Sequence, residues 1–134
     1  MTGVLLYFFT AIVFFAVDMV GINLLVQPVA LDAAGAIFLD GFRALPAILF
    51  YIGYAGGIFW FVTAPAMRSG AGLGSAFLSG AGLGAVAYGT YELTNLATLA
   101  AWTWRLTLVD LAWGTVLTGF SAAAGLWLTR LTRI

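Results

Sequence analysis

The sequence contains neither cysteine nor histidine, and its five basic residues are all arginine. The lack of cysteine excludes disulfide bonds and thiol chemistry, and without histidine the usual zinc and haem sites are also excluded. Charged residues make up 7% of the chain, against about 25% in soluble proteins. No basic patch is present, so we expect no nucleic-acid partner. A carboxylate-only site for a hard cation stays open, but we predict neither a metal nor an obligatory cofactor.

Hydrophobic residues make up 63% of the chain, and its mean hydropathy is +1.09. A soluble fold could not cover so apolar a chain with polar groups, so the solvent must be lipid. Four apolar runs, at about 4–26, 46–64, 72–101 and 106–128, are close to or above the roughly 20 residues that a membrane crossing needs. The first has no basic start and no cleavage site, so we interpret it as a retained helix. We expect Pro28 and Pro65 to end the first two helices.

These runs predict an all-α membrane protein with a single domain, residues 1–134, built as an antiparallel bundle of four transmembrane helices. The connection at 29–45 is either a loop or a short interfacial helix. With four crossings, Arg68, Arg130 and Arg133 share a side with both termini, and Arg43 and Arg105 lie on the other side. The excess of arginine predicts that the termini are cytoplasmic.

Small residues and tryptophans indicate how the helices pack and where they meet the membrane surface. We expect glycines to let helix backbones approach closely, and the candidates are Gly53, Gly57, Gly80, Gly84 and Gly114. Tryptophans favour the headgroup level, so Trp102, Trp104 and Trp127 are interpreted as interfacial anchors.

Polar side chains occur in all four runs at one predicted depth, in the outer half of the bundle. They are Asp18, Tyr51, Tyr54, Tyr88, Glu92, Asn95 and Asp110. A carboxylate inside a span costs several kcal/mol and usually faces the bundle interior or a water-filled cavity. Two interpretations stay open. One is a cavity that binds a headgroup, proton or cation; the other is a clasp in which tyrosine hydroxyls, Asn95 and Thr94 or Thr98 hold the carboxyl groups by hydrogen bonds and fix the helix register. Only two arginines lie near these three carboxyl groups, so we expect at least one carboxyl to be protonated at neutral pH.

Three segments resemble a known family. They are Phe-Tyr-x-x-Tyr-x-x-Gly from Phe50, Tyr-x-x-Tyr-Glu-Leu-Thr-Asn-Leu-Ala-Thr-Leu from Tyr88, and Val-Asp-Leu-Ala-Trp-Gly-Thr from Val109. The sequence is similar along nearly its whole length to bacterial four-helix membrane proteins filed as a domain of unknown function, number two thousand one hundred and seventy-seven of its series. Glu92 stands where that family usually has aspartate, and Gly21-Ile22 replaces a Trp-Leu pair.

The resemblance implies a location in the bacterial inner membrane, with several crossings, and no established activity. It also implies a set of motif residues: Asp18, Tyr51, Tyr54, Tyr88, Tyr91, Glu92, Thr94, Asn95, Thr98, Asp110 and Trp113.

Three functions are compatible with the sequence. The first is a non-catalytic protein that binds a small ligand or membrane lipid, with bound lipid, quinone or carotenoid as the candidates. The second is an accessory subunit that packs against a larger respiratory or photosynthetic complex. The third is an intramembrane enzyme or a proton- or cation-coupled transporter that uses Glu92 or Asp110. We rank the enzyme lowest, because the usual catalytic side chains are absent.

Overall fold

The structure is a computed structural model that describes residues 1–133; Ile134 lies outside the described residues. Within this range every regular element is helical. The chain forms four rods, two of which contain internal changes of helix type. The elements are α1 (Thr2–Gly21), a π-helical segment (Ile22–Val26), α2 (Gln27–Ala34), a 3-10 turn (Gly35–Ile37), α3 (Ala44–Ile58), a second π-helical segment (Phe59–Thr63), α4 (Ala64–Ser69), α5 (Leu73–Thr98) and α6 (Trp104–Thr132).

Neither proline ends its helix, so the prediction of helix ends at Pro28 and Pro65 is wrong. Each proline is the second residue of the α-helix that follows a π-helical segment, α2 after Val26 and α4 after Thr63. Proline lacks an N–H group and its ring clashes with the carbonyl four residues earlier. The wider π turn just before it relieves both problems, so the rod continues. The first rod therefore runs to Ile37 and shortens the predicted connection.

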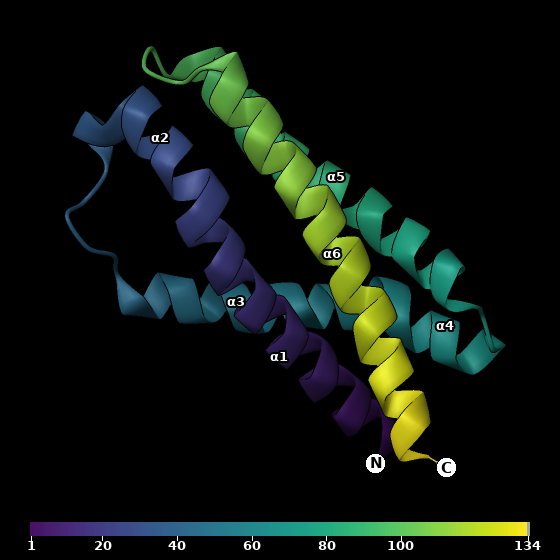
Figure 1. The fold of residues 1–134 in the computed structure, drawn as a ribbon. Helices are drawn as coiled ribbons and strands as arrows, with labels where there is room; N and C mark the ends of the chain where they lie inside the picture. The colour runs from purple at the N-terminus through teal and green to yellow at the C-terminus, as the bar shows by residue number, and fades with distance from the viewer. Residues whose placement is uncertain (134) are drawn as a thin grey trace.

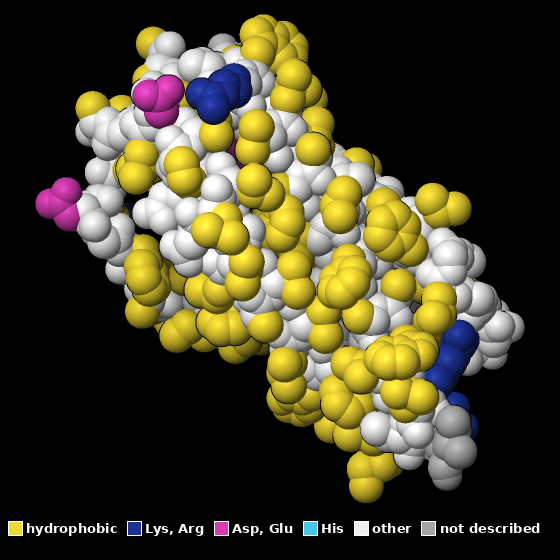
Figure 2. Space-filling view, in the orientation of Figure 1, with side chains coloured by type: hydrophobic (Ala, Val, Ile, Leu, Met, Phe, Trp, Pro, Cys, Tyr) yellow, Lys and Arg dark blue, Asp and Glu magenta, His cyan; other side chains and the backbone are white. Residues whose placement is uncertain are grey.

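Three rods are long and apolar enough to cross a membrane: Thr2–Ile37, Ala44–Ser69 and Trp104–Thr132. The fourth rod, α5, has 26 residues, which at about 1.5 Å per residue also exceeds the roughly 30 Å hydrocarbon core. Its glycines, serines and threonines lower its hydropathy, so its crossing stays a prediction. Hydrophobic side chains cover much of the visible face (Figure 2), and Phe42 and Trp60 are 81% and 70% exposed. Such a surface suits lipid.

The rods are not all aligned. Both termini lie at one end of the molecule, and α3 runs obliquely across α1 (Figure 1). Helices α5 and α6, joined by residues 99–103, lie side by side and form the most extensive contact in the chain. A central apolar cluster of Phe14, Ile58, Val62, Leu117 and Ala122 joins α1, the second rod and α6.

Glycines set the distance between α5 and α6. A Cβ atom on Gly84 would lie 2.4 Å from the carbonyl oxygen of Gly114, and one on Gly80 would lie 2.9 Å from that of Thr118. A Cβ on Gly114 would overlap the ring of Tyr88. These contacts require glycine, because any side chain would force the helices apart.

The two glycines predicted on the second rod behave differently. A Cβ on Gly53 or Gly57 would meet nothing within 4 Å. Within the described chain, the close packing expected of these two residues is therefore not realised, because α3 turns that face outward.

Candidate functional site

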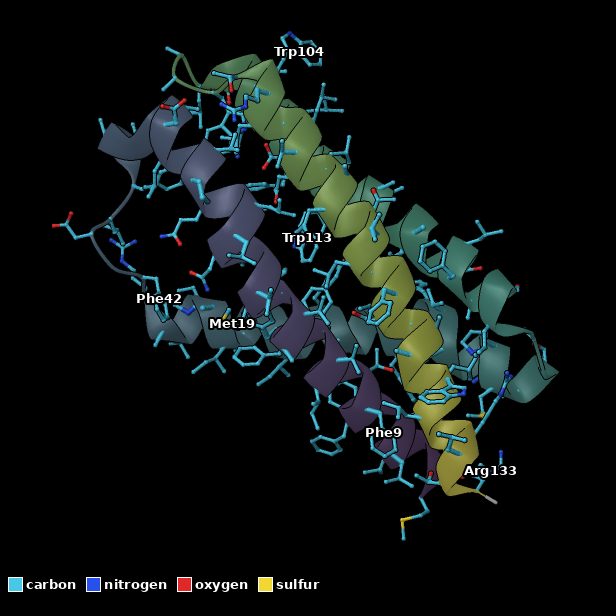
Figure 3. All side chains as sticks on the ribbon, viewed as in Figure 1. Phe9, Met19, Phe42, Trp104, Trp113 and Arg133 are labelled. Atoms are coloured by element: carbon cyan, nitrogen blue, oxygen red, sulfur yellow. The ribbon has the colours of Figure 1, made fainter. Side chains whose placement is uncertain are left out.

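Asp18 is the centre of a three-helix contact. It lies in α1 with 2% of its surface exposed, and each of its carboxyl oxygens accepts one hydrogen bond. The hydroxyl of Tyr51, from α3, donates to Oδ2 at 2.6 Å, and the indole Nε1 of Trp113, from α6, donates to Oδ1 at 3.0 Å. Figure 3 shows Trp113 reaching from α6 towards α1. One carboxyl group therefore fixes the register of three helices.

The space for Trp113 depends on the residue one turn after Asp18. A Cβ on Gly21 would lie 1.9 Å from the Trp113 ring. A larger side chain at position 21 is incompatible with this position of the indole. Glycine here is what allows the Trp113 bond to Asp18.

Glu92 and Asp110 form a second polar contact, between α5 and α6. Glu92 is 1% exposed, and its Oε1 accepts a hydrogen bond of 2.7 Å from the indole Nε1 of Trp102. Asp110 is also buried, and its carboxyl group is close to that of Glu92. Two neighbouring carboxyl groups can share a hydrogen bond only when one of them carries a proton.

Tyr54 and Tyr88 belong to a third group, in the middle of the bundle. The Tyr54 hydroxyl and Thr118 Oγ1 share a hydrogen bond of 2.8 Å, and the two tyrosine rings meet edge-on with centroids 6.0 Å apart. Thr118 also donates to the carbonyl of Gly114. This group ties α3 to α6 and packs α5 against both.

The remaining motif residues of α5 are not drawn into this core. Tyr91 is 53% exposed, and Thr94 and Thr98 are exposed and donate to carbonyl oxygens of their own helix. Asn95 is half-buried. Thr94 and Thr98 therefore do not hold the buried carboxyl groups; Tyr51 and Trp113 donate to Asp18, and Trp102 donates to Glu92.

No arginine reaches the buried carboxyl groups. Among residues 1–133 the one ion pair joins Arg105 to Asp32 at 3.8 Å, with side chains 70% and 79% exposed, so it contributes little stability. The same residues include no group of three potential acidic ligands that could hold a metal ion. Asp18 and Glu92 thus accept hydrogen bonds from neutral donors.

Sequence reasoning missed two partners. The sequence predicts Trp102 as an interfacial anchor, but its side chain is 7% exposed and its indole donates to Glu92. The other two predicted anchors, Trp104 and Trp127, are exposed. Thr118, which shares a hydrogen bond with Tyr54, is not among the predicted site residues. A ten-residue separation across a turn gives no periodic signal, so the Trp102–Glu92 pair could not be read from spacing.

Two hollows lie outside the polar core. One, of about 340 Å³, is an open groove between α1 and α3, and its lining consists of Tyr7, Phe8, Ala11, Ile12, Phe15, Ala16, Tyr51 and Ile52. The other, of about 160 Å³, lies where α4 turns into α5, and its lining consists of Phe61, Val62, Pro65, Ala66, Ser69, Ala71, Ser75, Ala76 and Ser79.

The apolar rods, the lipid-compatible surface and the buried carboxyls joined across helices define an integral membrane protein of the helical-bundle class. The chain matches, over residues 3–127, the family described as "Predicted membrane protein (DUF2177)". It belongs to this family, whose function is unknown. No curated protein and no solved structure matches the chain.

Proposed function

We propose that the protein is a non-catalytic membrane protein that holds the hydrocarbon chain of a membrane lipid in the groove between α1 and α3. The observation that supports this is the groove itself, an open hollow of about 340 Å³ lined almost wholly by apolar and aromatic side chains. Apolar grooves with a few fixed polar groups are the usual form of small-ligand sites. A hydrocarbon chain needs no polar partner and matches this lining.

The walls of the groove are held in place by hydrogen bonds. Tyr7 donates its hydroxyl to the carbonyl of Ile52 at 2.9 Å, and Tyr51 donates to Asp18. The rings of Phe15 and Tyr51 meet edge-on with centroids 5.0 Å apart. A preformed groove loses little conformational entropy when it is filled. In this proposal the Asp18 clasp shapes the lipid site and does not itself bind the ligand.

The test is to fill the groove and measure retained lipid. Ala16 is exposed and lines the groove, so Ala16→Trp would occupy it without entering the core. Ala112, an exposed alanine of α6 that does not line the groove, gives the matched control Ala112→Trp. Native mass spectrometry from mild detergent should show bound lipid in the wild type and in the control, and much less in Ala16→Trp.

Equal retention by all three proteins would refute the groove as the site. Photo-cross-linking with a diazirine-labelled acyl chain adds a positional check, because labels should fall within residues 7–16 and at Tyr51 or Ile52, which line the groove. Release of a quinone or a carotenoid in place of lipid would also contradict the proposed occupant.

A second candidate function, an accessory subunit of a larger membrane complex, is favoured by one observation. A Cβ on Gly53 or Gly57 of α3 would meet nothing within 4 Å in the described chain, and a helix surface with such small residues suits close packing against another helix. Because the chain has no cysteine, Gly53→Cys would introduce a unique thiol. Cross-linking from this position to another subunit in native membranes would favour this function, and cross-links to lipid alone would count against it.

We further propose a bacterial inner-membrane location with both termini in the cytoplasm. The support is the excess of arginine at the end that holds Arg68, Arg130 and Arg133. A cysteine introduced in place of Ser69 and one introduced in place of Asp40, each in a separate variant, should be labelled differently when intact cells are treated. A membrane-impermeant maleimide should label Asp40→Cys and spare Ser69→Cys; the opposite pattern would reverse the orientation.

A further inference from the structure

The corner between α4 and α5 differs in charge from the rest of the molecule. The five acidic side chains are Asp18, Asp32, Asp40, Glu92 and Asp110, so residues 41–91 and 111–133 contain none. Arg68 lies in the last turn of α4, Arg130 lies in the last turn of α6, and Arg133 directly follows α6. At that end, Figure 2 shows dark blue side chains without magenta ones on the visible face. Three cations therefore lie together without an acidic side chain to pair with.

The C-terminal turn of α6 is fixed against this corner. Arg130 donates from Nη2 to the carbonyl oxygen of Ala71 at 2.6 Å, and Arg133 reaches the sulfur of Met67. Figure 3 shows Arg133 at this end of α6. A guanidinium has five N–H donors, so the bond to Ala71 leaves most of those on Arg130 available. The corner is thus a preformed cationic site made by the C-terminal ends of α4 and α6 and the turn between α4 and α5.

Beside these cations lies the hollow of about 160 Å³, which is lined by the serines at 69, 75 and 79. Ser75 and Ser79 are exposed, one turn apart on α5, and neither is hydrogen-bonded to another of the described residues, whereas Thr90 and Thr94 donate back to their own helix. The α5 helix also begins here, after Gly72, without a side-chain cap. Free hydroxyls and uncapped N–H groups beside arginines are donors without acceptors.

We propose that this corner binds the phosphate of an anionic phospholipid headgroup. Phosphate oxygens accept charge-assisted hydrogen bonds from arginine and further bonds from hydroxyls and helix N-termini. The turn lies where rods of membrane-crossing length leave the hydrocarbon core, which is the depth of the headgroups. The net positive charge favours a lipid with an anionic headgroup over a zwitterionic one. This site is separate from the acyl-chain groove and does not depend on it.

The test compares lipid affinity of the purified full chain and its variants in mild detergent by native mass spectrometry. The probes are phosphatidylglycerol, phosphatidylcholine and inorganic phosphate. Arg68 is exposed, so Arg68→Gln should fold normally, and Ser75→Ala removes one hydroxyl from the hollow. Each should weaken phosphatidylglycerol binding, Arg68→Gln by roughly tenfold, as expected for a hydrogen bond to a charged group. Arg43→Gln, an exposed arginine at the other end, should have no effect.

Three results would overturn the proposal. They are unchanged binding in Arg68→Gln and Ser75→Ala, an equal loss in Arg43→Gln, and equal affinities for phosphatidylglycerol and phosphatidylcholine. Displacement of phosphatidylglycerol by inorganic phosphate at the same concentration would identify free phosphate as the ligand and refute the lipid. Ala16→Trp should leave this affinity unchanged, so failure of the acyl-chain groove and failure of the headgroup site give different results.

Discussion

The close contact of α5 with α6 can be tested at two glycines of the same helix. Gly82 and Gly84 both lie in α5, two residues apart, but only Gly84 faces α6. A Cβ on Gly84 would lie 2.4 Å from the Gly114 carbonyl oxygen and 2.7 Å from Thr118 Oγ1, whereas one on Gly82 would meet nothing within 4 Å. The substitutions Gly84→Ala and Gly82→Ala therefore add the same atom in two different environments.

The expected magnitudes follow from these distances. Both substitutions gain the same helix propensity, at most about 1 kcal/mol, so this contribution cancels between them. Overpacking costs about 1 to 3 kcal/mol. Because the nearest atom to the added Cβ belongs to the backbone, we expect Gly84→Ala to lower the free energy of unfolding by about 3 kcal/mol. Gly82→Ala should be neutral or slightly stabilising.

The assay is reversible unfolding in mixed micelles with increasing sodium dodecyl sulfate, followed by circular dichroism. Equal unfolding free energies for the two variants would refute the packing. The variant Thr118→Ala adds a control, because it removes the hydroxyl contact but leaves the backbone contact. Most of the destabilisation by Gly84→Ala should persist in the Thr118→Ala background. Full recovery of stability would mean that the Thr118 side chain, and not the distance between the two helix backbones, causes the clash.

Three further predictions concern the polar contacts. Tyr51→Phe should lower the unfolding free energy by about 1 kcal/mol, which is below the roughly 1.7 kcal/mol maximum for hydrogen bonds between membrane helices. The loss should be smaller in an Asp18→Asn background. Additive losses from the two substitutions would contradict the hydrogen bond between Tyr51 and Asp18. Trp102→Phe should destabilise the protein because it leaves a buried carboxyl without its donor, whereas Trp104→Phe, at an exposed position, should be neutral in the same assay. Infrared spectra at neutral pH should show a protonated-carboxyl band that disappears in Asp110→Asn and persists in Asp18→Asn; a spectrum without such a band would exclude the shared proton.

Much of the helical content could be predicted because hydrophobic run length is a direct consequence of bilayer thickness. The positions of the four rods follow from the lengths of the hydrophobic runs. Helical periodicity also accounts for the buried face of α6, which includes Asp110, Gly114, Thr118, Ser121 and Gly125. The helix ends at prolines could not be predicted, because the sequence does not show whether a π turn precedes the proline.

The site could be predicted only as a set of residues at one depth. That Asp18, Tyr51 and Trp113 meet requires the oblique crossing of α3 over α1, which depends on side-chain packing throughout the bundle. The pairing of Glu92 with Trp102 depends on how the connection at 99–103 folds back. Such contacts arise from tertiary geometry. The predicted depth of a residue in the membrane could therefore not show that Trp102, and not Thr98, is the hydrogen-bond partner of Glu92.

The residues that the sequence lacks explain the form of its polar core. With no histidine or lysine, and with every arginine near a helix end or in a connection, no cation is available at the depth of Asp18 and Glu92. Each carboxyl therefore takes neutral donors, a tyrosine hydroxyl and tryptophan N–H groups. Neutral donors satisfy hydrogen bonds without adding a second buried charge whose desolvation would have to be offset. Aromatic rings also fill the apolar space around them, so the same side chains that hold the carboxyls shape the groove beside Tyr51.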